Sequence, residues 1–429
     1  MNSRNRQLPG KTFFSNPFFT RILLFLSIFG PATITAMADN DASGVATYSI
    51  AGAKLGYPIL FMLLIITVLL GITQEMGMRL TLITRRGLAD LIREKFGVKA
   101  SLFIFATLII SNMGTIIVDV AAIKVTSSML KIPDILAIAV MIVIIGVVVI
   151  KGSYKLTQNI MLISSLFYLA YIISAFQAKP DWGLAASNLL YPHGVEFTAS
   201  YLKDYLIIGM GVLGTTITPW GQFFISSFAY DKKIEPEKIK YSQVETYWGA
   251  FLTDFFSFFM IVAIAATLFV NHVPLESGEQ AALAIKPFAG ELAGTLFAFG
   301  ILNAGFMGIV IVSLSTAYAF SEFFGISGSL NSSYQQSKTY YIIFFGQLIL
   351  AAVIVMFPGI SLFGLVVATQ ALNAMVLPFV FYYLIKLASD RSLMKEHVNN
   401  AFQKYFSISA TVVIFIASII TLVAGFITP

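Results

Sequence analysis

The sequence predicts an all-α polytopic membrane protein with eleven transmembrane helices, built as a 5+5 inverted repeat in which helices 1 and 6 are broken. Three observations support this prediction. Hydrophobic residues make up 58% of the 429 residues and charged residues only 11%, whereas a soluble domain carries about 25% charged residues. Eleven apolar segments are long enough to cross a bilayer, and two of them contain polar residues near their middle.

A membrane span needs about 20 predominantly apolar residues. The first segment is too long for the apolar core of a signal peptide, so we interpret it as the first span. The segments that qualify are 21–54, 57–82, 101–128, 134–151, 154–177, 202–230, 246–271, 290–320, 338–357, 360–385 and 406–427. They predict a cytoplasmic tail over 1–20, a first five-helix repeat over 21–177, a second over 202–385 and an eleventh helix over 406–427.

The positions of lysine and arginine predict the orientation. With the N-terminus in the cytoplasm, 21 of the 27 lysines and arginines fall on the cytoplasmic side and 6 on the other. This asymmetry follows the positive-inside rule. We therefore expect a multi-pass protein of the plasma membrane, which in a prokaryote is the inner membrane. The net charge of +6 does not indicate nucleic-acid binding, because the charges lie in short loops between apolar segments.

Segments 1 and 6 are each interrupted, at Asp39–Gly44 and at Thr215–Gln222. Pro219 removes a backbone donor from a helix, and Gly44 permits backbone angles that a helix does not use. LeuT-like secondary transporters have two inverted five-helix repeats whose first helices are broken, with carbonyls and half-helix ends facing a central site. The alternative is a simple kink, since proline and glycine are common in membrane helices.

Acidic residues in the first break favour a cation over other cargo. A carboxylate at the bilayer centre costs about 2.5–3.5 kcal/mol on insertion scales, so such a residue occurs mainly where it pairs with another group or has a function. We assign the cation site to Asp41 and leave Asp39 open, because either side chain can instead cap the second half-helix. Interhelical hydrogen bonding, the preferred role for Glu75 and Asn303, is the alternative to a role in transport for the polar residues elsewhere in the spans. These residues are Glu75, Asp119, Asp254, Asn303, Gln370 and Asn373.

The flanks of both breaks resemble the Nramp family of divalent metal transporters. Asp41-Ala42-Ser43-Gly44 aligns without a gap with the family's Asp-Pro-Gly-Asn motif, and Gly30-Pro31 opens the same stretch. Thr218-Pro219-Trp220 aligns with the family's Met-Pro-His motif. Gly87–Arg93 resembles the family's segment after helix 2, and Thr369-Gln370 and Leu377-Pro378-Phe379 match its tenth helix. The resemblance covers roughly residues 20–390.

The resemblance implies a metal site and also a change in its chemistry. The aspartate is retained, but glycine replaces the family's asparagine and threonine replaces its methionine. The positions that correspond to the metal ligands are Asp41, Ala38, Thr215, Thr218, Gly44 and Gln370. A thioether favours soft transition metals, whereas carboxylate, carbonyl and water suit Mg²⁺ and Mn²⁺. The chain is therefore most similar to the NRAMP-related magnesium transporter branch, and the two shorter side chains are expected to leave room for the waters that Mg²⁺ retains.

The residues that would relay protons in this family are mostly replaced. The sixth-helix histidines correspond to Trp220 and Ile225, and a third-helix acid corresponds to Ile116, although Asp119 remains. We therefore predict transport of Mg²⁺, and also Mn²⁺, that is uncoupled from protons. The alternatives are a proton symporter for Mn²⁺ or other transition metals, and a sodium-coupled carrier of organic solutes with the same fold.

The remaining expectations follow from the same residues. The metal ion is the transported substrate, no cofactor is implied, and the partners are the ion and the lipid bilayer, with no nucleic acid. The spans contain no HExxH motif and no histidine to activate a serine, so an intramembrane enzyme is not expected. A receptor or scaffold would not need two broken helices. The sequence leaves the oligomeric state open.

Overall fold

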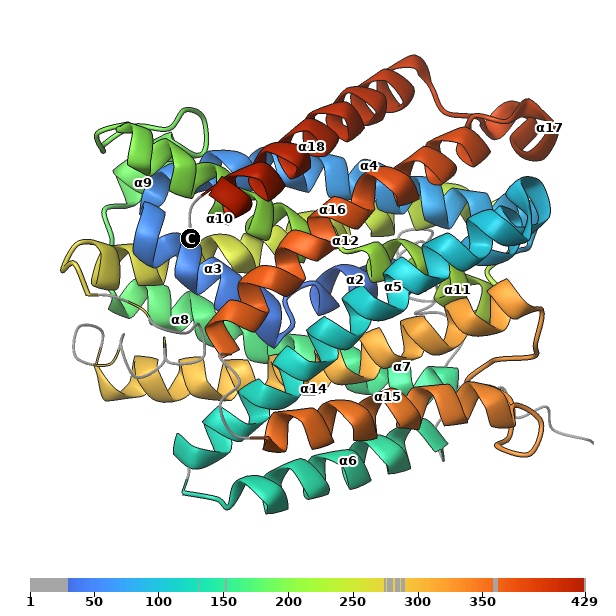
Figure 1. The fold of residues 1–429 in the computed structure, drawn as a ribbon, viewed down its shortest axis with the longest axis horizontal. Helices are drawn as coiled ribbons and strands as arrows, with labels where there is room; N and C mark the ends of the chain where they lie inside the picture. The colour runs from blue at the N-terminus through green and yellow to red at the C-terminus, as the bar shows by residue number, and fades with distance from the viewer. Residues whose placement is uncertain are drawn as a thin grey trace, which may run out of the picture.

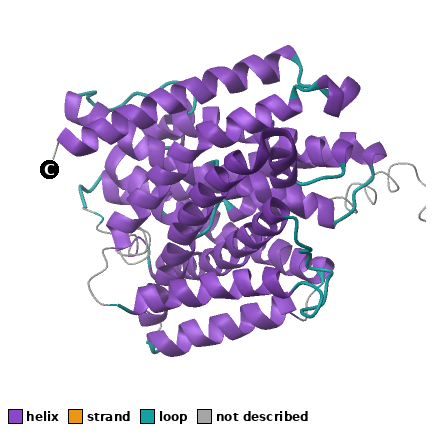
Figure 2. Ribbon diagram, turned by 45° about the vertical axis from the view of Figure 1, so that its right-hand side comes forward, coloured by secondary structure: helices purple, strands orange, loops and turns teal. Residues whose placement is uncertain are grey.

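The structure is a computed structural model that describes residues 30–129, 131–150, 153–273, 290–357 and 362–427, with the single residues 275, 281 and 286. The predicted tail over 1–20 and the first part of the first span lie outside the described residues. Helices dominate the fold, and the described residues include no strand (Figure 2).

The long helices lie side by side in a single bundle, with α6 and α15 along one flank and α18 along the opposite one (Figure 1). The helices of the bundle are α2 (Pro31–Ala38), α3 (Ala42–Leu55), α4 (Leu60–Thr84), α5 (Leu88–Met129), α6 (Asp134–Ile150), α7 (Tyr154–Ser165), α8 (Leu169–Gln177), α10 (Ala199–Thr216), α11 (Pro219–Asp231), α12 (Ile239–Ile264), α14 (Glu291–Phe324), α15 (Lys338–Met356), α16 (Leu362–Ala388) and α18 (Ala401–Ile427). Two short helices, α9 (Trp182–Asn188) and α17 (Arg391–Met394), lie in connections between them.

The predicted set of spans is confirmed. Among the described residues, eight helical stretches are long and apolar enough to cross a membrane, and α6 is a shorter apolar helix of the same kind. The interrupted pairs α2–α3 and α10–α11 provide the other two of the eleven spans. The division of the chain into repeats at 177 and 202 stays a prediction.

Both breaks are shorter than the sequence predicted. The first covers only residues 39–41, since α3 begins at Ala42, and the second covers only Ile217 and Thr218. The physical reason is capping. The residue before each second half-helix, Asp41 or Thr218, is extended and accepts a hydrogen bond from the backbone N–H three residues later. Pro219 then occupies the first turn of α11, where its missing N–H costs nothing.

Three irregular turns in other helical stretches were not predicted. Gly97 has φ 82° and separates a short helix at the start of α5 from the membrane-spanning part. A 3₁₀ turn at Leu166–Tyr168 divides the fifth span into α7 and α8, and a π turn at Ala265–Phe269 ends the seventh. Only the glycine has a sequence signal, because a positive φ favours a residue without a side chain.

The half-helices are held in the middle of the bundle by close backbone contacts. α2 packs on α12, α3 packs on α10 and α12, and α10 packs on α16. A Cβ at Gly249 of α12 would lie 3.1 Å from Cα of Thr33, and a Cβ at Gly214 of α10 would overlap the carbonyl oxygen of Gln370. Small residues at these points let the helix backbones approach closely, as in other membrane bundles.

Candidate cation site at the helix breaks

Asp41 is the N-cap of α3. Its Oδ1 accepts a hydrogen bond of 2.7 Å from the backbone N–H of Gly44 and another of 2.7 Å from the hydroxyl of Ser43. The capping role that the sequence left as an alternative is therefore present. Both bonds end on Oδ1, so Oδ2 lies outside the cap. Asp41 is only 2% exposed, which places a carboxylate deep in the bundle at the start of a half-helix.

Ser43 connects the first break to two other helices. Its hydroxyl accepts a hydrogen bond of 2.8 Å from Nε2 of Gln370 in α16, while its backbone N–H donates to Oδ1 of Asp119 in α5 at 3.3 Å. Gln370 in turn accepts a bond of 2.9 Å from Asn373, which lies one turn further along the same face of α16. In the sequence, Ser43 was identified as part of the aligned motif, and its place in this network was not predicted.

Asp39 joins the two breaks to each other. Its Oδ1 accepts a hydrogen bond of 2.9 Å from the hydroxyl of Thr218, and its Oδ2 accepts one of 3.4 Å from Nε2 of Gln74 in α4. The oxygen of Thr218 at the same time accepts the 3.1 Å bond from Gly221 that caps α11. One hydroxyl thus links the carboxylate of the first break to the helix that begins at the second.

Gly44 lies where the backbone of the first break meets α10. A Cβ at this position would be 2.6 Å from the carbonyl oxygen of Asp39 and 3.3 Å from Oγ1 of Thr215. In this structure, backbone therefore occupies the space that was expected to hold water. Oγ1 of Thr215 is buried and has no hydrogen-bond partner among the described residues.

The six residues of the predicted site lie around these two breaks. The carbonyl of Ala38 ends α2 and accepts a bond of 3.0 Å from the N–H of Asp41. Asp41, Gly44 and Thr215 are in direct proximity, and Gln370 reaches them through Ser43. Thr218 contacts Asp39.

The outer end of the first half-helix is held by Glu245 of α12. This buried carboxylate accepts bonds from the N–H groups of Gly30 (3.2 Å), Ala32 (3.4 Å) and Thr33 (2.7 Å) at the start of α2. A negative charge at a helix N-terminus is favourable because the first N–H groups have no partner within the helix. Glu245 was not predicted as part of the site because it lies one residue outside the predicted seventh span.

Other polar residues of the spans are mostly engaged in interhelical bonds. Glu75 pairs with Arg79 at 2.7 Å and accepts bonds from Gln243 and Gln403, and Asn303 donates to the carbonyl of Ser164 at 3.0 Å. Hydrogen bonding was the preferred prediction for Glu75 and Asn303. Asp254 is buried in α12, 4% exposed.

Asn40 fixes the first break to its neighbours. Its amide donates to the carbonyl of Thr253 at 2.9 Å and accepts from the hydroxyl of Ser257 at 2.8 Å. Its own carbonyl accepts a bond of 2.9 Å from Tyr168. Asn40 therefore holds the non-helical backbone against α12 and the fifth span, and it does not cap α3.

Comparison with known proteins identifies the family. Residues 32–424 match the model of the family described as Nramp, natural resistance-associated macrophage protein-like. The chain belongs to the Nramp family.

Its relatives agree with this assignment, and solved structures share its fold. A divalent metal cation transporter MntH of Granulibacter bethesdensis is 22% identical over 412 residues, covering 92% of this chain and 88% of the relative. A natural resistance-associated macrophage protein 2 homolog of Dictyostelium discoideum is 23% identical over 391 residues, 87% of this chain and 59% of the relative. The Eremococcus coleocola manganese transporter has a TM-score of 0.74 at 18% identity, with 96% of this chain and 90% of that chain covered. MhsT in complex with L-phenylalanine has a TM-score of 0.58 at 15% identity, covering 91% and 98%, so the structures show the shared fold.

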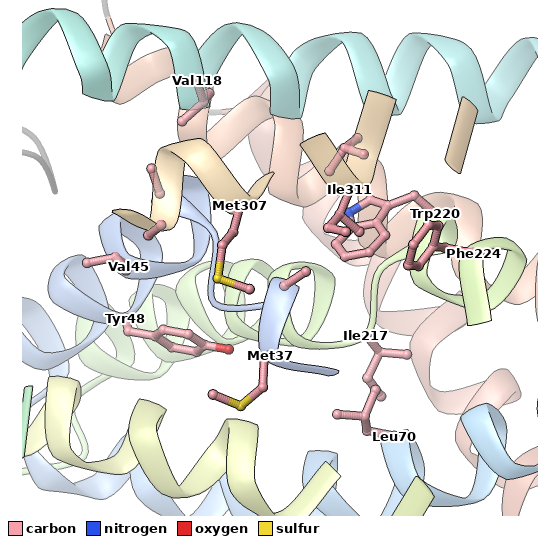
Figure 3. Packing of buried hydrophobic residues seen from close by; sticks show 14 of the residues in the cluster. Met37, Val45, Tyr48, Leu70, Val118, Ile217, Trp220, Phe224, Met307 and Ile311 are labelled. Carbon is pink, nitrogen blue, oxygen red and sulfur yellow. The ribbon is translucent and has the colours of Figure 1, made fainter. Parts of the chain in front are cut away.

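Apolar side chains surround the breaks of this Nramp protein (Figure 3). Trp220 lies against Phe224 and Ile311, and Met37 and Tyr48 lie close to the breaks. Trp220 and Ile225, which the sequence aligned with histidines of the Nramp motif, are both fully buried. The described residues contain no group of three or more His, Cys, Asp or Glu side chains that could hold a metal ion. None of the predicted ligand positions offers a sulfur atom.

Proposed function

We propose that this protein carries divalent metal cations, Mg²⁺ and also Mn²⁺, through the two helix breaks without carrying protons. The observation that supports the proposal is the arrangement at the breaks, where the buried carboxylate of Asp41 and the amide of Gln370 are joined through Ser43, beside the carbonyl ends of α2 and α10. Irregular backbone at membrane depth is tolerated where it lines a pathway or is buried in protein. The transport of divalent metals by relatives named MntH agrees with this role.

The proposed ligands are hard oxygen donors. Asp41 offers Oδ2 outside its cap, Ala38 and Thr215 offer carbonyl oxygens, and Gln370 offers an amide oxygen. With one coordinating carboxylate, a second carboxylate nearby at Asp39 and several neutral oxygens, such a site suits a divalent ion that keeps part of its water, which is how Mg²⁺ is usually bound. A thioether at position 218 would favour softer metals, but threonine stands there.

Cation binding in this proposal exchanges hydrogen bonds for ion contacts. Gln370 donates to Ser43, and Thr218 donates to Asp39. Both bonds connect separate helices, so a ligand that draws either side chain toward an ion also changes how those helices are held together. Gly44 contributes through the close approach of its backbone and not through a ligand atom.

The proposed lack of proton coupling is supported by the replaced relay positions. Trp220 and Ile225 cannot bind a proton in the working pH range, and the described part of α15 contains no arginine. A divalent ion does not need a coupled proton to enter a cell. A membrane potential of 100 mV is worth about 2.3 kcal/mol per charge, so it favours entry of a divalent cation by about 4.6 kcal/mol.

The experiment is uptake into proteoliposomes that contain a pH-sensitive dye, under an imposed inside-negative potential. We expect Mg²⁺ and Mn²⁺ to enter without acidification, and Cd²⁺ to compete no better than Mn²⁺. Acidification that depends on the metal gradient and disappears in Asp119→Asn would show a proton symporter with Asp119 as the relay. Cd²⁺ binding far more tightly than Mn²⁺ would contradict the oxygen-donor site.

A sodium-coupled carrier of organic solutes is the second function that the same fold could support. A carboxylate-bearing solute needs half-helix N-termini with little negative charge beside them. Asp39 and Asp41 place two carboxylates there. Sodium-driven uptake of an amino acid in the same vesicles, with no metal uptake, would establish that reading instead.

A further inference from the structure

A groove of about 610 Å³ runs between the end of α16 and the beginning of α18, away from the helix breaks. The two helices lie side by side, and α17 connects their ends at one edge of the molecule (Figure 1). The lysine and arginine distribution assigns this edge to the cytoplasmic side. The lining changes along the groove from charged at the mouth to apolar further in.

Two lysines flank the mouth of the groove. Nζ of Lys386 donates to the hydroxyl of Tyr382 at 3.2 Å and lies 5.6 Å from the ring centre of Phe96. Lys404 lies opposite, at the start of α18, with Nζ 5.9 Å from the ring centre of Tyr405. Within the described residues neither lysine forms an ion pair with an acid. Their charges are therefore available to an external anion.

The one acidic residue of the lining does not cancel these charges. Oδ1 of Asp390 accepts bonds from the hydroxyl (2.7 Å) and the N–H (2.8 Å) of Ser392 at the start of α17. These bonds, together with the nearby charge of Lys95, hold the pKa of Asp390 below its usual range. Asp390 is thus ionised, and its single negative charge is outnumbered by the two lysines of the lining. Lys386 and Lys404 leave the mouth with a positive charge.

The inner part of the groove suits a hydrocarbon chain. Lys404, Ile408 and Val412 are spaced four residues apart and so follow one face of α18. At 1.5 Å per residue, Val412 lies about 12 Å further along the helix than Lys404. Ile408 and Val412 are exposed, and Ile385 of α16 lines the opposite wall. A charged mouth and an apolar channel of this length resemble the two parts of a phospholipid.

We propose that this groove binds an anionic phospholipid of the cytoplasmic leaflet. Its phosphate lies between Lys386 and Lys404, and one acyl chain follows Ile408 and Val412. Basic pockets between membrane helices on the cytoplasmic side bind anionic headgroups in this way. The lipid ties the eleventh span, which has few buried residues, to α16, the helix that carries Gln370. The site requires no assumption about the transported ion.

The test measures lipid binding to the purified full-length protein by native mass spectrometry and by thermal stability. Three additions are compared: phosphatidylglycerol, phosphatidylcholine with the same chains, and glycerol 3-phosphate, which has the phosphate without the chains. We expect phosphatidylglycerol alone to remain bound and to stabilise the protein. Each lysine contributes about fivefold to the affinity, from roughly 1 kcal/mol per charge near an anionic surface.

Two variants separate the groove from general charge attraction. Lys386→Gln/Lys404→Gln removes the charges, with the exposed Lys338→Gln, at the start of α15 on the same predicted side, as the matched control. Ile408→Trp keeps both lysines and fills the apolar part. We expect the double variant and Ile408→Trp to lose the preference for phosphatidylglycerol and Lys338→Gln to keep it. A preference that survives in either of the first two variants, or equal binding of glycerol 3-phosphate, would overturn the proposal.

Discussion

Replacement of Thr218 by valine tests whether a single hydroxyl connects the two helix breaks. Valine has nearly the same shape as threonine, so the substitution removes the oxygen and leaves the packing volume unchanged. Two interactions are lost: the N-cap bond to Gly221 at 3.1 Å and the bond to Asp39 at 2.9 Å. The matched control is Thr218→Ser, which keeps the hydroxyl and loses only a methyl group.

The magnitude follows from these two bonds. Loss of a threonine N-cap costs about 0.5–2 kcal/mol of stability. Leaving a buried carboxylate oxygen without its donor adds about 1–3 kcal/mol. The expected loss for Thr218→Val is therefore about 1.5–5 kcal/mol, and about 1 kcal/mol or less for Thr218→Ser, which retains both bonds.

The assay compares unfolding in mixed detergent, with increasing dodecyl sulfate, against Mg²⁺ uptake into proteoliposomes. We expect the valine variant to unfold at lower denaturant and to transport Mg²⁺ more slowly, because the hydrogen bond between the two breaks is lost. The serine variant should resemble the parent protein in both measurements. If valine and serine behave alike, the hydroxyl does not connect the breaks and the reasoning is wrong.

Three further substitutions test other parts of the site. Asp41→Ala should abolish metal uptake while gel filtration still shows a monodisperse protein, and normal transport by this variant would make Asp39 the next candidate ligand. Gly44→Ala should lower the free energy of unfolding by about 1–3 kcal/mol and slow metal uptake, because its Cβ would meet the carbonyl of Asp39. The control is Gly346→Ala in α15, where a Cβ meets nothing within 4 Å. Glu245→Gln removes the negative charge that accepts three N–H bonds at the start of α2, and it should lower the free energy of unfolding by about 1–3 kcal/mol. The control Glu237→Gln changes an exposed residue and should have no effect. Equal melting temperatures for the two variants would count against the role of Glu245.

The fold could be predicted from the sequence because a membrane limits the choices. Every span must be an apolar helix of known length, and the alternation of lysine- and arginine-rich loops indicates how many times the chain crosses the membrane. The breaks were also visible, since Asp39, Asp41 and Pro219 interrupt apolar runs. Their lengths were overestimated because Asp41 and Thr218 cap the following helices, and a cap lets the helix resume at once.

The details of the site could be predicted only in part, because they depend on contacts between distant segments. From the sequence, glycine at position 44 was expected to remove a ligand side chain and leave room for water. In the structure the carbonyl of Asp39 lies beside Gly44, which local spacing does not reveal. Glu245 lies more than 200 residues from the helix end that it caps. Ser43 had a local signal in its position two residues after Asp41, yet its bonds to Gln370 and Asp119 require three helices to be in place.

The two acids of the first break have different partners, and this difference bears on ion selectivity. Asp41 is held within its own half-helix, whereas Asp39 reaches across to Thr218 at the second break. Two carboxylates two residues apart repel each other when both are charged, and the repulsion is strong where water is excluded. A divalent cation cancels both charges, while Na⁺ leaves one of them uncompensated. We therefore expect the pair itself to favour divalent over monovalent cations, without any need for a sulfur ligand. Replacing Asp39 by asparagine while keeping Asp41 should then weaken Mg²⁺ binding far more than Na⁺ binding, and equal losses for the two ions in a competition assay would show that Asp39 serves only to hold Thr218.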